Sequence, residues 1–558
     1  MKTMLRKLHF VLLLLPIAAM SQWTQLGDTI DSATPPGSAN IANFGESVAL
    51  SEDGTIMAVG APARGLSEDG ASYVQVFRFE SGEWVQIGST IEGISSNTSY
   101  SENRVGVSIG LSADGSVLAV GEQNWNVEDG RVRMFRNIND EWVQIGEDIA
   151  ELGVDDFGSR LSLSSDGDVV AIHGIADDLW AGMVKVFQNV SDSWVQIGGT
   201  IQGAEMFGML GYDMSMNADG TKLALIQVEG FFFPTIVIYE YVDSEWEHTS
   251  TIFDGGVPSL SADGTKLAIG ETTYSDQSGR VKLYSWSTND WVEEATFEPQ
   301  NPVANGGFGQ TVSMSANTDV IVIGTDTQGR AVNVYQNTDS GWELAGEFNV
   351  EEGMTGRLIP ALSANGSVLA IGERVRNSDD DPNNFIFYRS ATVYKNCDLA
   401  TIQIPQIENT DFTEGDTLAD LDVTAEGTLT WYADEDLTIV LEEDTPLVNE
   451  TTYYVTQTDA IGCTSEATAV TVSFLDLTDF VQNHFSYYPN PVKDVLNFTI
   501  ENDNVQAVQL YDLSGKLVFE QKSGQTIGSV NLSVLPKAMY IAKIQTERDV
   551  YTFKLVKE

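Results

Sequence analysis

Residues 48–60 read VALSEDGTIMAVG, in which apolar side chains alternate with small or polar ones on both sides of an Asp-Gly pair. Alternation with period two predicts a β-strand, and Asp-Gly between two such runs predicts a tight hairpin turn. The first run occurs seven times, as VALSEDG (Val48), IGLSADG (Ile109), LSLSSDG (Leu161), MSMNADG (Met214), PSLSADG (Pro258), VSMSANT (Val312) and PALSANG (Pro360). The second run follows each copy, so the chain repeats one supersecondary unit.

Two further runs complete each unit. The third is VQVF at Val74 and its counterparts, and the fourth begins with a tryptophan, as in WVQIG at Trp84. Four strands in a repeat of roughly 50 residues predict one blade of a β-propeller. The seventh unit has no fourth run after Ala391, but WTQLG at Trp23 can supply it. We therefore predict an all-β chain with a seven-bladed propeller over residues 22–396, closed by its N-terminal strand.

One unit resembles a known repeat. FGESVALSEDGTIMAVGAP, from Phe44 to Pro62, resembles an FG-GAP repeat of integrin-type propellers, and Phe157-Gly158 and Phe308-Gly309 share its first two residues. The resemblance implies a propeller of that type. The family's calcium loop, Asp-x-Asp-x-Asp-Gly, is replaced here by a tight Ser-x-Asp-Gly turn, so these turns supply no calcium ligands.

The segment 397–479 has a different composition, with 19 Asp+Glu and no Lys or Arg. Cys397 and Cys463 flank Trp431 within short β-like runs. In an exported chain, one cysteine pair around a tryptophan predicts a small Ig-like β-sandwich with one disulfide bond. The spacing resembles that of Ig-like modules in cell-surface proteins of Bacteroidota.

The tail, residues 480–558, carries YPNPVKDVLNFTI, VQLYDLSGKLVF, LSVLPKAMYIAKIQT and FKLVKE in that order. These motifs resemble the type A C-terminal sorting domain of the type IX secretion system in Bacteroidota. The matching residues are Tyr488, Pro489, Asn490, Pro491, Asp512, Gly515, Tyr540, Lys554 and Lys557. The resemblance implies a second small Ig-like sandwich, with the type IX secretion machinery as its partner.

Residues 1–21 combine Lys2, Arg6 and Lys7 with the apolar run FVLLLLPIAA and small residues at the end, which predicts a secretory signal peptide. The apolar run is shorter than the roughly 20 residues that span a bilayer. The 558 residues carry 29 Lys+Arg against 81 Asp+Glu, a net charge of −52. This charge disfavours binding to nucleic acid and to anionic membranes. We expect a secreted or cell-surface protein without a transmembrane segment.

Candidate ligand-binding residues follow the second strands of the repeats. They are Glu122, Gln227, Glu271, Thr325 and Glu373, which we expect to surround the axial opening on the face with long, variable loops. In the last of these loops, Asp379, Asp380, Asp381 and Asn383 provide oxygen ligands of the kind that calcium prefers. A solvated acidic rim explains the same residues without a metal.

No nucleophile elbow, P-loop or His-Glu-x-x-His motif is present in the sequence. We therefore expect a non-enzymatic protein that binds or adheres to an extracellular glycan or protein through the variable loops, with calcium as the one candidate cofactor. A glycoside hydrolase or lyase with carboxylates in the central cleft is the first alternative. A structural scaffold without a ligand is the second.

Overall fold

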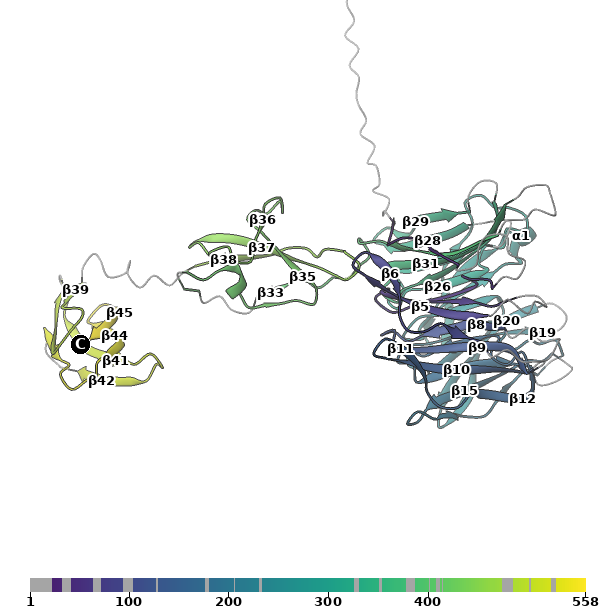
Figure 1. Cartoon of the computed structure of the whole chain (residues 1–558), viewed down its shortest axis with the longest axis horizontal. Coiled ribbons are helices and arrows are strands. Elements are labelled where there is room, and N and C mark those ends of the chain that lie inside the picture. Colours follow the sequence, from purple (N-terminus) through teal and green to yellow (C-terminus); the bar gives the residue numbers. More distant parts are fainter. Residues whose placement is uncertain are drawn as a thin grey trace, which may run out of the picture. The chain divides into compact units, whose positions relative to one another are not determined.

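The computed structural model describes residues 23–32, 42–63, 72–93, 104–126, 129–175, 180–204, 206–229, 233–325, 331–350, 354–377, 387–400, 402–407, 412–413, 415–473, 485–500, 503–522 and 528–558. The predicted signal peptide lies outside these residues. Apart from the helical turn α1 (Tyr274–Gln277) and the 3₁₀ turn η1 (Leu418–Asp420), the elements of the described part are β-strands (Figure 1).

Seven antiparallel sheets occupy the described residues from 23 to 395, and we number them 1 to 7 in chain order. Sheet 1 consists of β3 (Ser47–Leu50), β4 (Ile56–Ala61), β5 (Tyr73–Glu80), β6 (Glu83–Gln86) and β7 (Ile91–Glu92). Sheet 2 consists of β8 (Arg104–Leu111), β9 (Val117–Asn126), β10 (Asp129–Ile138), β11 (Glu141–Gln144) and β12 (Ile149–Asp155). Sheet 3 consists of β13 (Leu161–Leu163), β14 (Val169–Gly174), β15 (Met183–Asn189), β16 (Trp194–Gln196) and β17 (Ile201–Gln202).

Sheets 4 to 7 follow the same order. Sheet 4 consists of β18 (Met214–Met216), β19 (Lys222–Glu229), β20 (Phe233–Val242) and β21 (Glu245–Ile252), and sheet 5 of β22 (Val257–Leu260), β23 (Lys266–Glu271), β24 (Arg280–Ser287) and β25 (Asp290–Phe297). Sheet 6 consists of β26 (Thr311–Met314), β27 (Val320–Gly324), β28 (Ala331–Thr338) and β29 (Gly341–Asn349). Sheet 7 consists of β30 (Met354–Leu362), β31 (Val368–Asn377), β32 (Phe387–Lys395), β1 (Thr24–Gln25) and β2 (Ile30–Asp31).

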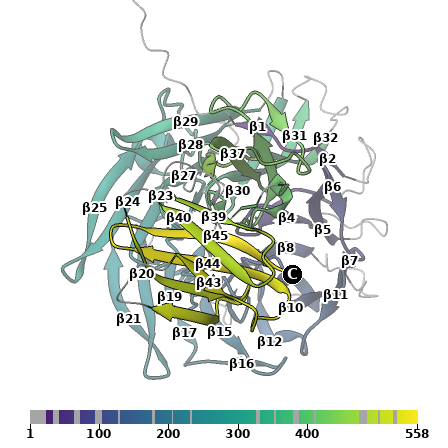
Figure 2. The ribbon, with the colours of Figure 1, turned by 90° about the vertical axis from the view of Figure 1, so that its left-hand side faces the viewer.

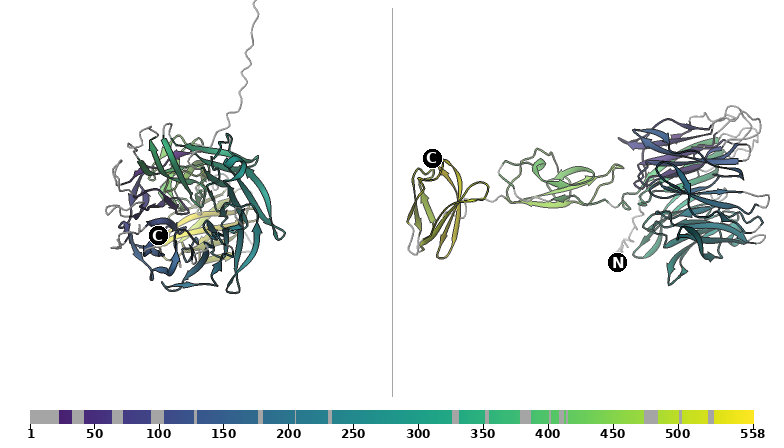
Figure 3. Two further views of the ribbon diagram at one scale, coloured as in Figure 1. Left: turned by 90° about the vertical axis from the view of Figure 1, so that its right-hand side faces the viewer. Right: turned by 90° about the horizontal axis from the view of Figure 1, so that it is seen from below.

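The sheets are arranged radially around a common centre, as Figure 2 and the left view of Figure 3 show. Their innermost strands contact one another in the order β3, β8, β13, β18, β22, β26 and β30, and β30 contacts β3 again. The second strand of each sheet is buried on both faces, and in β14 all six residues are buried. The hydrophobic core therefore lies between neighbouring sheets of a closed, propeller-type ring.

The two ends of the ring meet in sheet 7. Strand β1 pairs with β32, with Thr24 opposite Lys395 and Gln25 opposite Tyr394. Leu26 is buried, and its backbone N–H donates to the carbonyl oxygen of Val393 at 2.8 Å. The pairing covers the edge of β32, which would otherwise expose unpaired backbone groups.

The hairpins between the first and second strands lie on one side of the ring, which we call the turn face. In sheet 1, the hydroxyl of Ser51 donates to Asp53 at 2.6 Å and accepts the N–H of Ile56 at 3.0 Å. The same arrangement recurs in sheet 2, between Ser112 and Asp114 at 2.7 Å. These side chains satisfy backbone groups of a sharp turn, which explains the repeated Ser-x-Asp-Gly.

Backbone hydrogen bonds also join the hairpins of neighbouring sheets. They run from Glu52 N to Ala113 O, Ala113 N to Ser165 O, Ser165 N to Ala218 O, Ala218 N to Ala262 O, Ala316 N to Ala364 O and Asn365 N to Glu52 O, at 2.7 to 3.3 Å. The last of these bonds links sheet 7 back to sheet 1. The backbone thus links all seven hairpins in one series, from sheet 5 through sheets 4, 3, 2, 1 and 7 to sheet 6.

The acidic segment forms a separate group of strands. A four-stranded sheet has the order β36 (Val440–Leu441), β35 (Thr428–Tyr432), β37 (Thr451–Thr458) and β38 (Thr468–Val472), and β33 (Gln406–Ile407) pairs with β34 (Val423–Thr424). Trp431, Tyr453 and Val455 belong to its core. This region therefore buries a hydrophobic core of its own.

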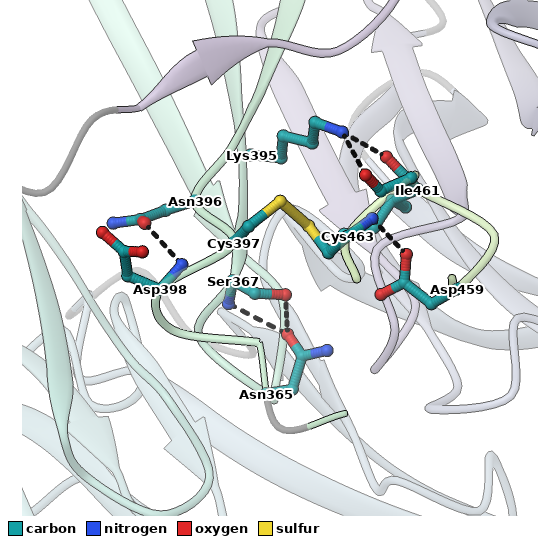
Figure 4. The surroundings of a disulfide bond; sticks show 10 residues. Asn365, Ser367, Lys395, Asn396, Cys397, Asp398, Asp459, Ile461 and Cys463 are labelled. Atoms are coloured by element: carbon teal, nitrogen blue, oxygen red, sulfur yellow. Dashed lines mark hydrogen bonds between the residues drawn. A yellow bond between two sulfur atoms is a disulfide. The ribbon is translucent and has the colours of Figure 1, made fainter. Parts of the chain in front are cut away.

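The predicted bond between Cys397 and Cys463 is present, but its position differs from the prediction. Cys397 follows β32, and Cys463 lies in the loop Asp459–Thr464, which belongs to the compact unit of the ring. Ile461 and Cys463 are buried in the core between sheets 7 and 1. Lys395 Nζ donates to the carbonyl oxygens of Ile461 at 2.6 Å and Gly462 at 3.2 Å (Figure 4). The bond is therefore not the internal bridge of an Ig-like sandwich.

The tail contains two sheets around one core. One has the order β39 (Phe485–Tyr488), β40 (Val495–Ile500) and β43 (Ser529–Asn531), and the other has the order β42 (Leu517–Lys522), β41 (Val505–Tyr511), β44 (Ala538–Thr546) and β45 (Val550–Lys557). The rings of Tyr487 and Phe553 stack between the sheets, with centroids 3.6 Å apart. These aromatic contacts hold β39 against β45.

Leu26→Ala tests the closure of the ring. Leu26 is buried beside β32, so its truncation should lower the free energy of unfolding by about 2–5 kcal/mol. The exposed Val195→Ala is the matched control and should change it by less than about 0.5 kcal/mol. Equal unfolding midpoints for the two variants in chemical denaturation would contradict the closing role of this segment.

Gly54→Ala tests the turn face. Gly54 has φ +72°, and an added Cβ would overlap the side chain of Val368 in sheet 7. Gly82 has φ +92° with no atom near an added Cβ, so Gly82→Ala isolates the backbone strain, about 1–2 kcal/mol. Thermal unfolding should show the larger loss for Gly54→Ala, and equal losses would contradict the tight packing between these two hairpins.

Candidate functional site

The long connections of the ring lie opposite the turn face, and we call their side the loop face. The five predicted ligand residues lie at the loop-face ends of the second strands, and three of them are buried. Glu122 is fully buried, and Glu271 and Thr325 are 8% exposed. Because side chains alternate along a strand, these residues point into the space between neighbouring sheets.

Glu122 forms ion pairs inside the ring. Arg131 Nη2 lies 2.7 Å from Glu122 Oε2, and Arg133 Nε contacts the other carboxylate oxygen. Arg131 also pairs with Asp148 at 2.5 Å. A buried carboxylate requires such partners, because desolvation of an unpaired charge is costly. Glu122 is thus held by two arginine side chains of the same sheet, Arg131 and Arg133.

Glu271 has an equivalent environment in sheet 5. Arg280 Nη2 lies 2.8 Å from its Oε2, and Lys282 Nζ lies 3.6 Å from its Oε1. Lys282 also pairs with Asp254 at 2.6 Å. In both sheets the arginine follows the glutamate by nine residues, since it occupies the directly opposite position on the third strand.

The other three predicted residues have different surroundings. Glu373 accepts weak hydrogen bonds from Ser390 at 3.5 Å and Thr392 at 3.4 Å. Gln227 is half-buried in β19. Thr325 Oγ1 accepts the N–H of Ala331 at 2.7 Å and lines a cavity of about 200 Å³ between sheets 5 and 6.

The proposed calcium ligands Asp379, Asp380, Asp381 and Asn383 lie outside the described residues. Within the described part of the chain, no group of three or more His, Cys, Asp and Glu side chains has the arrangement of a metal site. Calcium binding by the last loop stays a prediction.

The loop face of sheets 3 and 4 carries a cluster that the sequence analysis missed. Large apolar side chains are exposed there, with Trp180 at 49%, Met206 at 55% and Phe207 at 51%. Trp180, Phe207 and Met209 have φ values of 58°, 61° and 46°, a left-handed conformation that is costly for bulky residues. Met209 N donates to Trp180 O at 3.1 Å, so the two loops run side by side.

Tyr212, whose N–H donates to the carbonyl oxygen of Met209 at 3.0 Å, packs against a charged side chain. The guanidinium of Arg160 lies 4.9 Å from the ring centroid of Tyr212, and its Nε lies 3.6 Å from Asp213 Oδ1. Desolvation raises the pKa of Asp213, and the positive charge of Arg160 opposes this shift. Arg160 and Tyr212 are both partly exposed, so the cluster offers an aromatic face and a guanidinium to solvent.

His173 lies beneath this cluster. Its ring is fully buried, meets that of Tyr212 edge-on at 6.1 Å, and Nδ1–H donates to the carbonyl oxygen of Leu210 at 3.0 Å. Burial lowers the pKa of His173 to about 4, so the ring is neutral at physiological pH. His173 therefore supports the position of Tyr212 and does not carry charge at the surface.

One signal in the sequence could have revealed the cluster. Trp180 does not belong to the seven tryptophans that recur at the start of the fourth strands, and it stands in a long connection. The repeated Trp84 and Trp246 each donate their indole N–H to a backbone carbonyl of the neighbouring sheet, at 2.8 and 3.2 Å. A tryptophan outside the repeat is thus free of that packing role.

In the tail, the residues of the sorting motif stabilise the edge of the last strand. Asn490 Oδ1 accepts the N–H of Val556 at 2.8 Å, and its Nδ2 donates to Lys554 O at 3.0 Å. The backbone of Val492 then continues this pairing with Val556 and Glu558. The side-chain amide of Asn490 therefore replaces a peptide group and covers the edge of β45.

The remaining motif residues also have structural positions. Asp512 Oδ1 accepts the N–H groups of Ser514 and Lys516, both at 3.0 Å, and Gly515 has φ +80°, which shapes the turn between β41 and β42. Tyr540 Oη donates to Pro536 O at 2.9 Å, Lys557 is buried, and Tyr488, Pro489, Pro491 and Lys554 are exposed.

Comparison with known families identifies this tail. Residues 486–558 match the family described as secretion system C-terminal sorting domain. The chain is therefore a substrate of the type IX secretion system and is secreted or located at the cell surface. In the described residues, no helix is long and apolar enough to cross a membrane.

Solved structures similar to this chain include proteins of propeller type. A putative 6-phosphogluconolactonase from Bacteroides uniformis is 15% identical, with a TM-score of 0.39 over 57% of this chain and 89% of its own. A second one, from Bacteroides fragilis, is 14% identical, with a TM-score of 0.40 over 60% and 98%. Hydrazine synthase of Kuenenia stuttgartiensis is 11% identical, with a TM-score of 0.40 over 64% and 99%. The search of curated proteins found no match.

Asn490→Ala tests the cover of the last strand. Loss of the side-chain amide leaves the N–H of Val556 without its acceptor, so a reporter protein fused to residues 480–558 should be exported less efficiently. The matched control is Gln509→Ala, which removes an exposed hydrogen bond to Glu520 at 2.6 Å. The extracellular fraction of the reporter, in a host with this secretion system, is the measurement; equal export of both variants would contradict a role for the Asn490 cover.

Proposed function

We propose that this protein is a secreted or cell-surface glycan-binding protein whose ligand binds at the loop face of sheets 3 and 4. The observation that carries the proposal is the exposed pair Trp180 and Phe207 in left-handed backbone conformations. Backbone hydrogen bonds through Met209 link Trp180 to Tyr212, whose ring packs against Arg160. Exposed apolar groups of this size mark interaction sites, and backbone strain persists where function requires it.

The chemistry of the cluster favours a sugar ligand. Aromatic rings offer flat apolar faces for the C–H side of a sugar ring, and the guanidinium and carboxylate beside them are hydrogen-bonding partners for hydroxyl groups. These groups come from connections of two neighbouring sheets on a rigid ring. Such loops on a rigid scaffold are the usual location of binding sites.

The ion pairs formed by the carboxylates favour a binding function over a catalytic one. The glycosidase alternative requires two carboxylic acids on either side of the reacting bond. Glu122 and Glu271 are engaged by arginine and lysine side chains inside the ring. Of the acids in the described residues, Asp213 at the loop face has a raised pKa because of desolvation, and the positive charges of Arg160 and Arg357 oppose this shift.

The proposal also includes the type of each domain. We infer a seven-bladed propeller of FG-GAP type, an Ig-like spacer in the acidic segment, and a signal peptide at residues 1–21. The seven sheets and the pairing of β1 with β32 support the first of these. A structural scaffold without a ligand is the alternative, and the exposed aromatic cluster weighs against it.

The double variant Trp180→Ala/Phe207→Ala tests the proposed site. Both side chains are exposed, so their loss should leave the unfolding midpoint unchanged within about 2 °C. On a glycan array, binding by the variant should fall at least about tenfold, since stacking against an aromatic ring is lost. Val190→Ala is the control, because Val190 is 53% exposed but lies in the hairpin between β15 and β16 on the turn face.

Array binding that is equal for the double variant and the native protein would contradict this site. If the native protein itself binds no glycan on the array, the scaffold alternative is favoured. Either result leaves the sorting domain unaffected, since its assignment rests on the tail alone.

A further inference from the structure

A cavity of about 200 Å³ lies between sheets 5 and 6, at the loop-face ends of their strands. Its lining comes from β28 and β29 of sheet 6, from Ser278 after α1, and from the connection between β25 and β26. Four residues with side-chain amides line it: Gln300, Asn301, Asn333 and Asn349. We call this cavity the amide pocket.

Sheet 6 leaves this space unfilled because it lacks the ion pairs that occupy the same position in two other sheets. In sheets 2 and 5, Glu122 and Glu271 pair with arginines that are directly opposite on the third strand. The equivalent residues of sheet 6 are Thr325 and Ala331, whose backbone groups are joined by a hydrogen bond of 3.0 Å. A threonine and an alanine side chain therefore replace a glutamate and an arginine.

The next position on the same face of the third strand shows the same replacement. Arg133 in sheet 2 and Lys282 in sheet 5 contact the glutamate of their own sheet, whereas sheet 6 has Asn333 at this position. Asn333 is directly opposite Ile323, which belongs to the core between sheets 5 and 6. The apolar core between these two sheets thus ends at the loop face in a polar cavity.

Polar groups of the amide pocket are left without partners in the described part of the chain. Ser278 is 7% exposed, and its hydroxyl forms no hydrogen bond with another described residue. The half-buried side-chain amide of Asn333 and the exposed one of Asn301 form none there either. Buried polar groups are normally hydrogen-bonded, so the pocket offers donors and acceptors to a ligand.

A strained turn borders the pocket. Ser275, Asp276 and Gln277 of α1 have φ values of 45°, 56° and 63°, so three successive residues other than glycine are left-handed. The carbonyl oxygen of Ser278 then accepts the N–H of Phe308 at 2.9 Å, which joins this turn to the connection between β25 and β26. Such strain persists only where the surrounding structure maintains it, and it is concentrated at functional sites.

We propose that the amide pocket binds one neutral sugar residue, at the end of a glycan chain. Its volume is below the roughly 300–1,000 Å³ of pockets for drug-sized ligands, which suits a single ring. Side-chain amides both donate and accept hydrogen bonds, as do the hydroxyl groups of a sugar. This inference deepens the proposed function, on which it rests for the class of ligand, and it adds a second site on different residues.

The charge of the pocket favours a neutral ligand. Among the described residues that line it, Glu347 is the one with a charge, and its Oε1 accepts the Nδ2–H of Asn349 at 2.9 Å. One carboxylate is too few for calcium, which takes six to eight oxygen ligands, and it repels an anionic ligand. Val303 and Phe308 add apolar surface for the C–H groups of a sugar ring.

The test uses the chain from residue 22 to 558 and ligand-observed NMR titration with the methyl glycosides of glucose, galactose, mannose and N-acetylglucosamine. The native protein should bind at least one of these probes saturably. Asn333→Leu removes the amide at nearly constant volume and should weaken this binding at least about tenfold. Gln75→Leu is the matched control, because Gln75 has the same position in VQVF of sheet 1 as Asn333 has in VNVY of sheet 6. It should leave binding unchanged.

A second variant fills the pocket. Thr325→Glu/Ala331→Arg introduces the ion pair of sheets 2 and 5 into sheet 6 and should abolish binding of the probe. If either this variant or Asn333→Leu does not fold, judged by thermal unfolding, Gln300→Ala/Asn301→Ala carries the test. Both of these residues are exposed, so the fold should be unaffected, and probe binding should weaken at least about threefold.

Two results would overturn the inference: no saturable binding of any of the four probes, or equal affinity of the folded pocket variants and the native protein. Tighter binding of the amine methyl glucosaminide than of every neutral probe, lost in Glu347→Gln, would also overturn it and assign the pocket to a cation.

Failure of the proposed function is distinguishable from failure of this inference. Trp180→Ala/Phe207→Ala changes the loop face of sheets 3 and 4 and should leave binding of the single-ring probe unchanged. If this double variant also leaves array binding unchanged, the aromatic site is wrong. Dependence of probe binding on Asn333 would still support the amide pocket in that case.

Discussion

The pairing of β1 with β32 joins residues near the two ends of the ring and sets the conditions for everything inside it. A row of sheets that is not closed would leave the innermost strands and one core face of both end sheets, sheets 1 and 7, without a neighbour. Closure places the apolar second strands of the end sheets 1 and 7 between two neighbours as well, and five of the six residues of β4 in sheet 1 are buried. The hydrogen bonds between neighbouring hairpins add a second closure on the turn face, independent of side chains.

This rigid closure allows the loop face to vary. The hairpins of the turn face are short and alike, because Ser-x-Asp-Gly satisfies its own backbone, whereas the opposite connections differ in length and composition. The strained residues Trp180 and Phe207 are part of these connections. The free energy that holds them comes from the packed sheets below, such as the contact of Tyr212 with His173.

The all-β, propeller-type architecture and the sorting tail could be predicted because their information is local. Period-two alternation and Asp-Gly turns define strands and hairpins, and the tail motifs occur in a fixed order. The disulfide pair was also predicted correctly, but not its location, because the spacing of two cysteines does not reveal which core surrounds Cys463. The environment of Glu122 could not be predicted, because the strand register that places Arg131 opposite Glu122 is not visible in the sequence. The same holds for Arg357, Arg374 and Arg389, which lie side by side on sheet 7 although 17 and 15 residues separate them in the sequence.

The bond between Cys397 and Cys463 also changes what a protease can release. These residues enclose the segment 398–462 in a covalent ring, so a single cut within this segment leaves both fragments attached until the disulfide is reduced. Detachment of the sorting domain from the propeller therefore requires a cut after Cys463. A nick in the acidic segment would appear only on a reducing gel, whereas removal of the tail would change the mass of the protein under both conditions.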